Sequence, residues 1–159
     1  FQRQNLDVVL ALLEEMGEVP EDIAEAFSGL TIPGRMEVVS SKPLVIHDGA
    51  HNPPAVEELL KDLPVELTCV FNCLRTKRPQ EMIRRLENKA DRFVMTETSR
   101  PASVPAQELA DETQLPAQAV ENPLEAQRTA EEMAGRNGVV LVTGSLYLLG
   151  EIRGSHPDF

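Results

Sequence analysis

Short apolar runs alternate with amphipathic helix patterns along this chain from residue 36 onward. Residues 139–142 are apolar at every position, which is typical of a strand buried on both faces of a parallel sheet. Strands that alternate with helices favour right-handed crossovers and helices on both sides of the sheet. We therefore predict an α/β fold, a three-layer, Rossmann-like domain whose six-stranded sheet is mostly parallel.

The individual elements follow from hydrophobic periodicity and from helix start and stop residues. The predicted strands are 36–39, 44–47, 66–71, 92–96, 117–120 and 139–142. The predicted helices between and after them are 53–63, 79–89, 106–111, 123–135 and 146–152. Ahead of this region we predict a helix over 5–17, a short acidic helix over 20–27 and a turn-rich linker over 28–34.

Composition excludes several classes of protein. The net charge is -11 over 159 residues, whereas a nucleic-acid surface needs clustered Lys and Arg. No apolar run approaches the roughly 18 residues of a membrane span, and no secretory signal opens the chain, so we expect a cytoplasmic protein. Cys69 and Cys73 would lie about 13 Å apart in an extended run, too far for a disulfide, so we predict free thiols.

The sequence Asp-Gly-Ala-His-Asn-Pro at residues 48–53 marks a candidate site, because ligands of open α/β sheets gather where strands end and helices begin. We expect Asp48 at the strand tip, exposed toward the crevice. Asn52 is a favoured helix N-cap and Pro53 suits the first turn. Capping accounts for Asn52 and Pro53 but not for Asp48 or His51, for which we expect a functional role.

Two further motifs could contact anions. In Thr143-Gly144-Ser145 the serine precedes a predicted helix, where it either binds an anion or simply caps the helix. In Pro33-Gly34-Arg35 a guanidinium follows a turn, and Arg suits bidentate contact with phosphate. A basic cluster at Arg75, Lys77 and Arg78 is either a solvated face or a set of cations that could help to hold a nucleotide.

Other motifs are missing from the sequence. His47 and His51 are four residues apart, but the glycine and proline around them speak against a helical zinc pair, so no metal site is predicted. The sequence also has no phosphate loop, dinucleotide fingerprint or serine elbow. We expect that this domain lacks a complete catalytic apparatus of its own.

Taken in order, the three motifs resemble the C-terminal domain of folylpolyglutamate synthase/dihydrofolate synthase, the folate branch of the Mur ligase superfamily. The resemblance runs across nearly the whole chain. The opening Phe-Gln-Arg-Gln-Asn resembles the helix that ends the central ATPase domain of that family. The resemblance therefore assigns residues 1–30 to the tail of the ATPase domain and a linker, and residues 31–159 to the C-terminal glutamate ligase domain.

The resemblance also implies an activity: ATP- and Mg²⁺-dependent addition of L-glutamate to dihydropteroate or a folate through an acyl phosphate. It implies that Arg35 contacts the ATP phosphates, that Asp48 contacts the nucleotide at its ribose and that Asn5 lies near the adenine. His51, also assigned a catalytic role, and Ser145 would bind the incoming glutamate. Lys77 occupies a place where many relatives carry a basic residue before Asp, but Arg78 follows it here.

The family's phosphate loop and magnesium ligands lie on domains outside this sequence, so the resemblance implies an inactive fragment whose partner is the ATPase domain of the same monomeric protein. Two other functions stay open: a peptidoglycan Mur-type amino acid ligase domain, and a non-catalytic nucleotide-binding module. The sequence Gly-Ala-His at residues 49–51 favours the folate branch. A non-catalytic module would have no physical need for Arg35, Asp48, His51 and Ser145.

Overall fold

The computed structural model describes residues 2–18, 23, 25 and 32–154, which belong to two compact units, Phe1–Ile32 and Pro33–Phe159. In the first unit, α1 (Gln2–Met16) ends at Gly17, whose φ of 72° allows the left-handed turn that stops the helix. The predicted helix over 20–27 lies outside the described residues except for Ile23 and Glu25, which are helical. No helix in the described part of the chain is long and apolar enough to cross a membrane.

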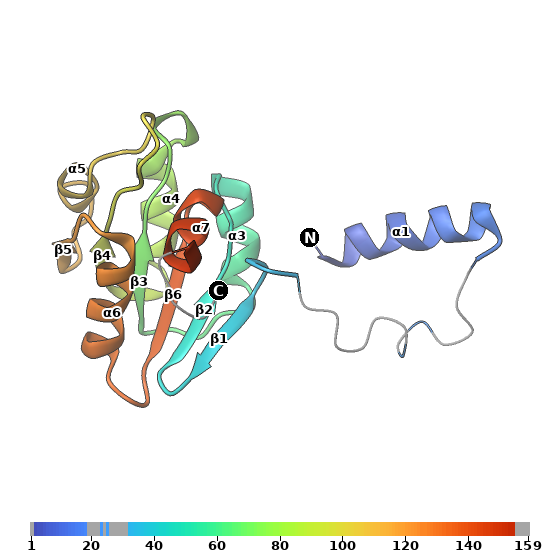
Figure 1. Cartoon of the computed structure of the whole chain (residues 1–159), viewed down its shortest axis with the longest axis horizontal. Helices are drawn as coiled ribbons and strands as arrows, with labels where there is room; N and C mark the ends of the chain where they lie inside the picture. Colours follow the sequence, from blue (N-terminus) through green and yellow to red (C-terminus); the bar gives the residue numbers. More distant parts are fainter. Residues whose placement is uncertain (1, 19–22, 24, 26–31, 155–159) are drawn as a thin grey trace. The chain divides into compact units, whose positions relative to one another are not determined.

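The second unit is built on a six-stranded sheet with the order β1-β2-β6-β3-β4-β5 (Figure 1). Its strands are β1 (Glu37–Ser41), β2 (Leu44–His47), β3 (Leu67–Phe71), β4 (Ala90–Met95), β5 (Ala117–Ala119) and β6 (Val139–Thr143). Only β1 is antiparallel, because it forms a hairpin with β2, and all other neighbours run parallel. The predicted mostly parallel sheet is confirmed.

Helices cover both faces of the sheet, as predicted (Figure 1). They are α3 (Pro53–Leu60), α4 (Pro79–Leu86), α5 (Ala106–Ala110), α6 (Pro123–Ala134) and α7 (Leu146–Gly154), with a 3-10 turn, η1 (Arg75–Lys77), before α4. Alternate strand residues point to opposite faces. In β3, Cys69 and Phe71 pack with α3, α4 and α5, whereas Val70 packs with α6 and α7. Both cysteines are free, as predicted. Both are also buried, and burial raises the pKa of each thiol.

The parallel pairing brings the carboxyl ends of three strands together. In the register, β6 lies between β2 and β3, with Val142 opposite both His47 and Val70. The residues that follow these strands therefore emerge at one edge of the sheet, called here the carboxyl edge. Two of the predicted motifs, residues 48–53 and 143–145, begin at this edge.

Candidate functional site

Three segments far apart in the sequence meet at the carboxyl edge: the 33–36 turn, the 48–52 loop and residues 143–145. The Gly49 amide donates a 2.8 Å hydrogen bond to the Gly34 carbonyl, and the Asp48 amide donates a 3.0 Å bond to the Val142 carbonyl. All three motifs found in the second unit's sequence thus form a single locus.

Asp48 organises this locus from within. Its Oδ1 accepts a 2.8 Å hydrogen bond from the Ala50 amide and its Oδ2 accepts a 2.9 Å bond from the Met36 amide. The expectation that Asp48 is exposed toward the crevice is wrong, since the residue is only 7% exposed. A carboxylate can be buried in this way because backbone N–H groups replace the hydrogen bonds of water. Asp48 therefore joins the 48–52 loop to the 33–36 turn.

Arg35 lies beside the same loop. A Cβ atom placed on Gly49 would lie 3.1 Å from an Arg35 guanidinium nitrogen and 2.3 Å from a terminal carbon of Leu146, so only glycine fits here without a shift. Arg35 is half-buried, yet within the described part of the chain it forms no hydrogen bond and no ion pair. A half-buried guanidinium with free donors suits an anionic ligand.

His51 is held by its own loop. Its Nδ1 lies 2.9 Å from the Gly49 carbonyl oxygen, and because a carbonyl only accepts, Nδ1 carries the hydrogen. Among the described residues, Nε2 has no hydrogen-bond partner and remains available to a ligand. Asn52 caps α3 as predicted, its side-chain oxygen accepting a 2.9 Å bond from the Ala55 amide. The N-cap of α3 therefore does not involve the His51 side chain.

Ser145 performs the capping role that the sequence left open. It is 3% exposed, and its hydroxyl accepts a 3.1 Å hydrogen bond from the Tyr147 amide in the first turn of α7. The hydroxyl hydrogen is still free to donate to a further acceptor. The preceding Gly144 has a φ of 105°, and a Cβ there would lie 2.2 Å from the backbone oxygen of Asn72. The close approach of β6 to β3 at this edge therefore requires glycine.

Sequence reasoning missed Asn72, which closes the neighbouring part of the edge. This fully buried amide donates to the carbonyls of Thr96 and Val104 at 2.8 and 3.1 Å, and it accepts a 3.1 Å bond from Ser103. Its signal in the sequence is a polar amide directly after the strand-like run at residues 67–71. In the structure all five residues of that run, which form β3, are buried. Such a residue must find internal partners, and these partners come from the segment after β4.

Sequence reasoning also assigned no role to Glu37 and Arg153, which form a half-buried ion pair between β1 and α7. They are 116 residues apart, and no local pattern relates them. His47 lies in β2 as predicted, and its Nε2 is 2.9 Å from the Gln127 side-chain oxygen on α6. Burial lowers the pKa of His47. No group of three or more His, Cys, Asp or Glu within the described ranges could hold a metal ion.

The basic cluster after β3 is mostly a solvated face. Arg75 pairs with Glu108 at 2.5 Å and Arg78 pairs with Glu81 at 3.1 Å, with all four side chains well exposed. Lys77, half-buried, has no partner among the residues that the structure describes.

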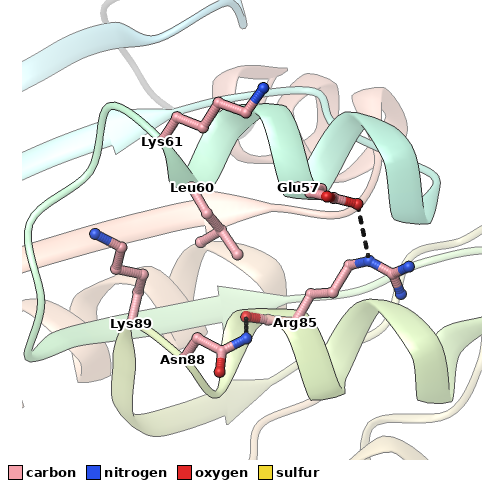
Figure 2. A pocket seen from close by; sticks show the side chains of 6 residues that line it. All are labelled: Glu57, Leu60, Lys61, Arg85, Asn88 and Lys89. Atoms are coloured by element: carbon pink, nitrogen blue, oxygen red, sulfur yellow. Dashed lines mark hydrogen bonds and ion pairs between the residues drawn. The ribbon is translucent and has the colours of Figure 1, made fainter.

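A hollow of about 610 Å³ lies between α3 and α4 (Figure 2). Its lining residues are Glu57, Leu60, Lys61, Arg85, Asn88 and Lys89. Arg85 pairs there with Glu57 at 3.7 Å, and Lys89 donates to the Leu63 carbonyl at 2.8 Å. These residues lie toward the carboxyl ends of both helices, where the chain turns back toward the opposite edge of the sheet. The hollow, called here the α3–α4 groove, contains none of the site motifs.

Comparison with known proteins identifies the class. Residues 34–146 match the Mur ligase family, glutamate ligase domain. The chain therefore belongs to the Mur ligase family through this domain. The matched region contains residues 34–36 of the turn, the 48–52 loop and residues 143–145. It therefore covers all of the locus described above except Pro33.

Particular relatives narrow the comparison. The dihydrofolate synthase/folylpolyglutamate synthase of Bacillus subtilis is 34% identical over 166 residues, covering 96% of this chain and 38% of the relative. A UDP-N-acetylmuramoyl-L-alanyl-D-glutamate–2,6-diaminopimelate ligase of Synechococcus elongatus is 44% identical over 93 residues, covering 50% of this chain and 18% of that protein. The chain thus spans well under half the length of these curated relatives.

Solved structures share the fold. Escherichia coli FolC in complex with DHPP and ADP superposes with a TM-score of 0.82 at 28% identity, covering 91% of this chain and 36% of that one. A bifunctional folylpolyglutamate synthase/dihydrofolate synthase with Mn, AMPPNP and L-glutamate bound gives a TM-score of 0.79 at 25% identity, covering 91% and 37%. The first of these structures contains DHPP and ADP, the second contains Mn, AMPPNP and L-glutamate, and each chain includes a part with this architecture.

Proposed function

We propose that this chain is the glutamate-ligase part of an ATP-dependent amide ligase that adds L-glutamate to dihydropteroate or a folate. The observation that carries the proposal is the convergence of Arg35, Asp48, His51 and Ser145 at one sheet edge, inside the matched family region. Residues 1–30 would then be the tail of the preceding ATPase domain and a linker, in a monomeric cytoplasmic enzyme. The buried free thiols fit a reducing compartment.

The proposed reaction has two steps. The γ-phosphoryl group of ATP passes to the substrate carboxylate, forming an acyl phosphate and ADP. The glutamate amine then attacks the acyl carbon, inorganic phosphate leaves with the electrons of the broken C–O bond, and the amine loses a proton. Chemistry of this kind depends mainly on positioning and on neutralising charge.

Each site residue has a part that its surroundings support. Arg35 is half-buried and has no side-chain partner among the residues that the structure describes, and it would contact the ATP phosphates. Asp48 uses one lone pair of each oxygen on backbone amides, which leaves others for the nucleotide ribose. His51 through Nε2, and Ser145 through its hydroxyl hydrogen at the start of α7, would bind glutamate, with His51 also placed at the reacting amine. Asn5 lies in α1, in the first unit, and its proposed place near the adenine rests on the resemblance alone.

Mg²⁺ would neutralise the transferring phosphates, and its ligands are proposed to lie on the ATPase part of the enzyme. Within the described ranges no carboxylate or imidazole cluster fits the ion. On this proposal, the 159-residue chain alone does not turn over ATP. ADP formation by the isolated chain, with glutamate and folate supplied, would contradict it.

A chimera tests the proposal directly. This chain replaces the matching part of the Bacillus subtilis relative, and ADP release is measured with ATP, dihydropteroate or folate, and glutamate. We expect ADP release that depends on glutamate, and a His51→Ala change should raise the KM for glutamate much more than the KM for ATP. Equal effects on the two KM values would remove the assigned role of His51, and a folded chimera without activity would contradict the proposal.

A second candidate function is addition of an amino acid to a nucleotide-sugar peptide, because the diaminopimelate ligase of Synechococcus elongatus matches half of this chain at 44% identity. The same chimera design separates the two. If the second function is correct, a hybrid in which this chain replaces the matching part of the diaminopimelate ligase should be active with diaminopimelate. The hybrid with the Bacillus subtilis relative should then be inactive.

A further inference from the structure

The 33–36 turn is held in an unusual backbone conformation. Gly34 has a φ of 69° and Met36 a φ of 47°, so left-handed residues flank Arg35 on both sides. Glycine adopts this region freely, but a residue with a long side chain such as methionine does so only where the surroundings enforce it. The direction of the Arg35 side chain therefore depends on the contacts that hold this turn.

One of those contacts comes from β1. The Gly34 amide donates a 2.7 Å hydrogen bond to Oε2 of Glu37, and the same oxygen accepts a hydrogen bond from the Arg153 guanidinium on α7. The Glu37 and Arg153 side chains are only 22% and 25% exposed. A single carboxylate oxygen thus joins the turn to α7.

The partners of Arg153 are few. Its Nε is buried and makes no hydrogen bond among the described residues, so Glu37 is the acceptor that balances its charge there. A buried Nε without a partner is costly and needs a compensating role. The ion pair with Glu37, which orients the Glu37 carboxylate, offsets the cost of this unpartnered Nε.

Helix α7 also contacts the rest of the locus. A Cβ on Gly34 would lie 2.9 Å from a terminal carbon of Leu149, and Leu146 packs over Gly49. At its start, α7 is capped by Ser145. One short helix therefore touches both the Arg35 side and the Ser145 side of the locus.

From these contacts we propose that Glu37 and Arg153 form a positioning pair, which fixes the 33–36 turn and thereby aims the Arg35 guanidinium at its anionic ligand. The proposal rests on the proposed function in so far as Arg35 contacts the phosphates of ATP. Neither residue touches the nucleotide. Loss of the pair lets the turn relax toward ordinary backbone angles, and Arg35 then no longer points at the phosphates.

The first test concerns the turn alone and needs no ligand. Amide hydrogen exchange is measured by NMR in this 159-residue chain, comparing the wild type with Glu37→Gln. The glutamine places an NH₂ group beside Arg153 and breaks the ion pair, so we expect exchange at Gly34 to speed up about tenfold or more. The Ala55 amide, capped by Asn52, is the internal reference and should not change.

A matched control breaks a different ion pair. Glu108→Gln removes the charge of the carboxylate that accepts hydrogen bonds from the exposed Arg75 at 2.5 and 2.8 Å, and it should leave exchange at Gly34 unchanged. If Glu37→Gln does not fold, Arg153→Lys keeps the charge near Glu37 with less reach and should give a smaller acceleration. Unchanged exchange at Gly34 in Glu37→Gln, or in Arg153→Lys if Glu37→Gln does not fold, would overturn the positioning pair, whatever the protein binds.

The second test uses the active chimera. Glu37→Gln should raise the KM for ATP about fivefold to tenfold, with the KM for glutamate and kcat changed less than about twofold. In an Arg35→Ala background the same change should have no further effect on the KM for ATP, because the pair acts through Arg35. If the pair had only a structural role, Glu37→Gln would lower the fraction of folded enzyme. It would not raise the KM for ATP selectively, and its effect would not depend on Arg35.

The two proposals fail separately. If Arg35→Ala leaves the KM for ATP unchanged, the proposed contact between Arg35 and the phosphates is wrong. If Arg35→Ala raises that KM but Glu37→Gln does not, or if the two effects multiply in the double variant, the positioning pair is wrong while the proposed function stands.

Discussion

The carboxyl edge and the α3–α4 groove differ in how their polar groups are satisfied. At the carboxyl edge, Asp48, Asn72 and Ser145 are buried, and their partners are mostly backbone groups. In the groove, Arg85 on α4 forms an ion pair with Glu57 on α3 at 3.7 Å (Figure 2). Beside the groove, Lys61 pairs with Glu58 at 2.5 Å, and both of those side chains are exposed. The groove has a volume of about 610 Å³, yet none of the site motifs lines it. Pre-organised polar groups, rather than hollow volume, distinguish a candidate site from an ordinary surface depression.

The largest expected effect breaks the edge itself. Gly144→Ala puts a Cβ 2.2 Å from the backbone oxygen of Asn72 at a residue whose φ is 105°. We expect a loss of about 3 kcal/mol or more in the free energy of unfolding, measured by urea denaturation. Gly150→Ala in α7 is the matched control, since nothing lies within 4 Å of its Cβ position. It should stabilise the helix by about 0.5–1 kcal/mol. Equal stability of both variants would mean that β6 and β3 do not need their close approach.

The next effect compares one arginine from each region. Arg35→Ala should raise the KM for ATP of the chimera about tenfold to a hundredfold, because a charge-assisted contact to phosphate is worth about 1.5–3 kcal/mol. Arg85→Ala in the groove should leave that KM unchanged, since Arg85 pairs with Glu57 and Glu81 on the helices that line the groove. A similar rise for both variants would show that the contrast between the regions has no functional meaning.

A smaller effect concerns His47, which lies in β2 just before the 48–52 loop. Burial lowers its pKa below the ordinary 6.5. Below about pH 6.5, His47 therefore binds a proton in the unfolded chain but not in the folded chain. The free energy of unfolding consequently falls as the pH falls. The folded state recovers this proton only below its own, lower pKa.

His47→Gln removes this titration while keeping a polar side chain opposite Gln127. The free energy of unfolding of the wild type, relative to that of the variant, should be constant above about pH 7 and should decrease between about pH 7 and pH 5. Denaturation midpoints at several pH values measure it. A relative stability that rises with acidity would mean that the His47 pKa is raised, not lowered.

The smallest effect is expected in the groove. Lys61→Met breaks the exposed pair with Glu58, whose side chains are 62% and 42% accessible. Solvent screens such a pair, so the denaturation midpoint and the KM for ATP should both stay within experimental error. A clear change in either value would make the groove part of the functional surface.

Much of the fold could be predicted from local patterns. The predicted strand at 44–47 has the bounds of β2, and the predicted starts of all five helices of the second unit are confirmed at Pro53, Pro79, Ala106, Pro123 and Leu146. These starts are readable because proline, asparagine and serine act within one turn of their own position. Helix ends were predicted one to three residues too late at α3 through α6, because the exact last residue of a helix is only weakly marked in the sequence; at α6 the predicted last residue, Gly135, is the C-cap.

The candidate site was only partly predictable. Arg35, Asp48, His51 and Ser145 were selected from their motifs, and the structure brings the motifs together at one edge. The orientation of Asp48 was predicted wrongly because its partner amide on Met36 is 12 residues away, in a turn whose position depends on the hairpin of β1 and β2. Asn5 belongs to the other unit, so its role stays a prediction.

By itself, the sequence determined which segments are strands and helices and which face of each is apolar, and it singled out the candidate site residues, because these depend on neighbours within a few positions. The tertiary structure decided which of those residues share a locus and which hydrogen bonds each one forms there. The pairing of β2 with β6 placed Asp48 next to residues 143–145. The link from Glu37 to Arg153 crosses 116 residues, and only the packing of α7 against the sheet brings such distant charges within hydrogen-bond reach.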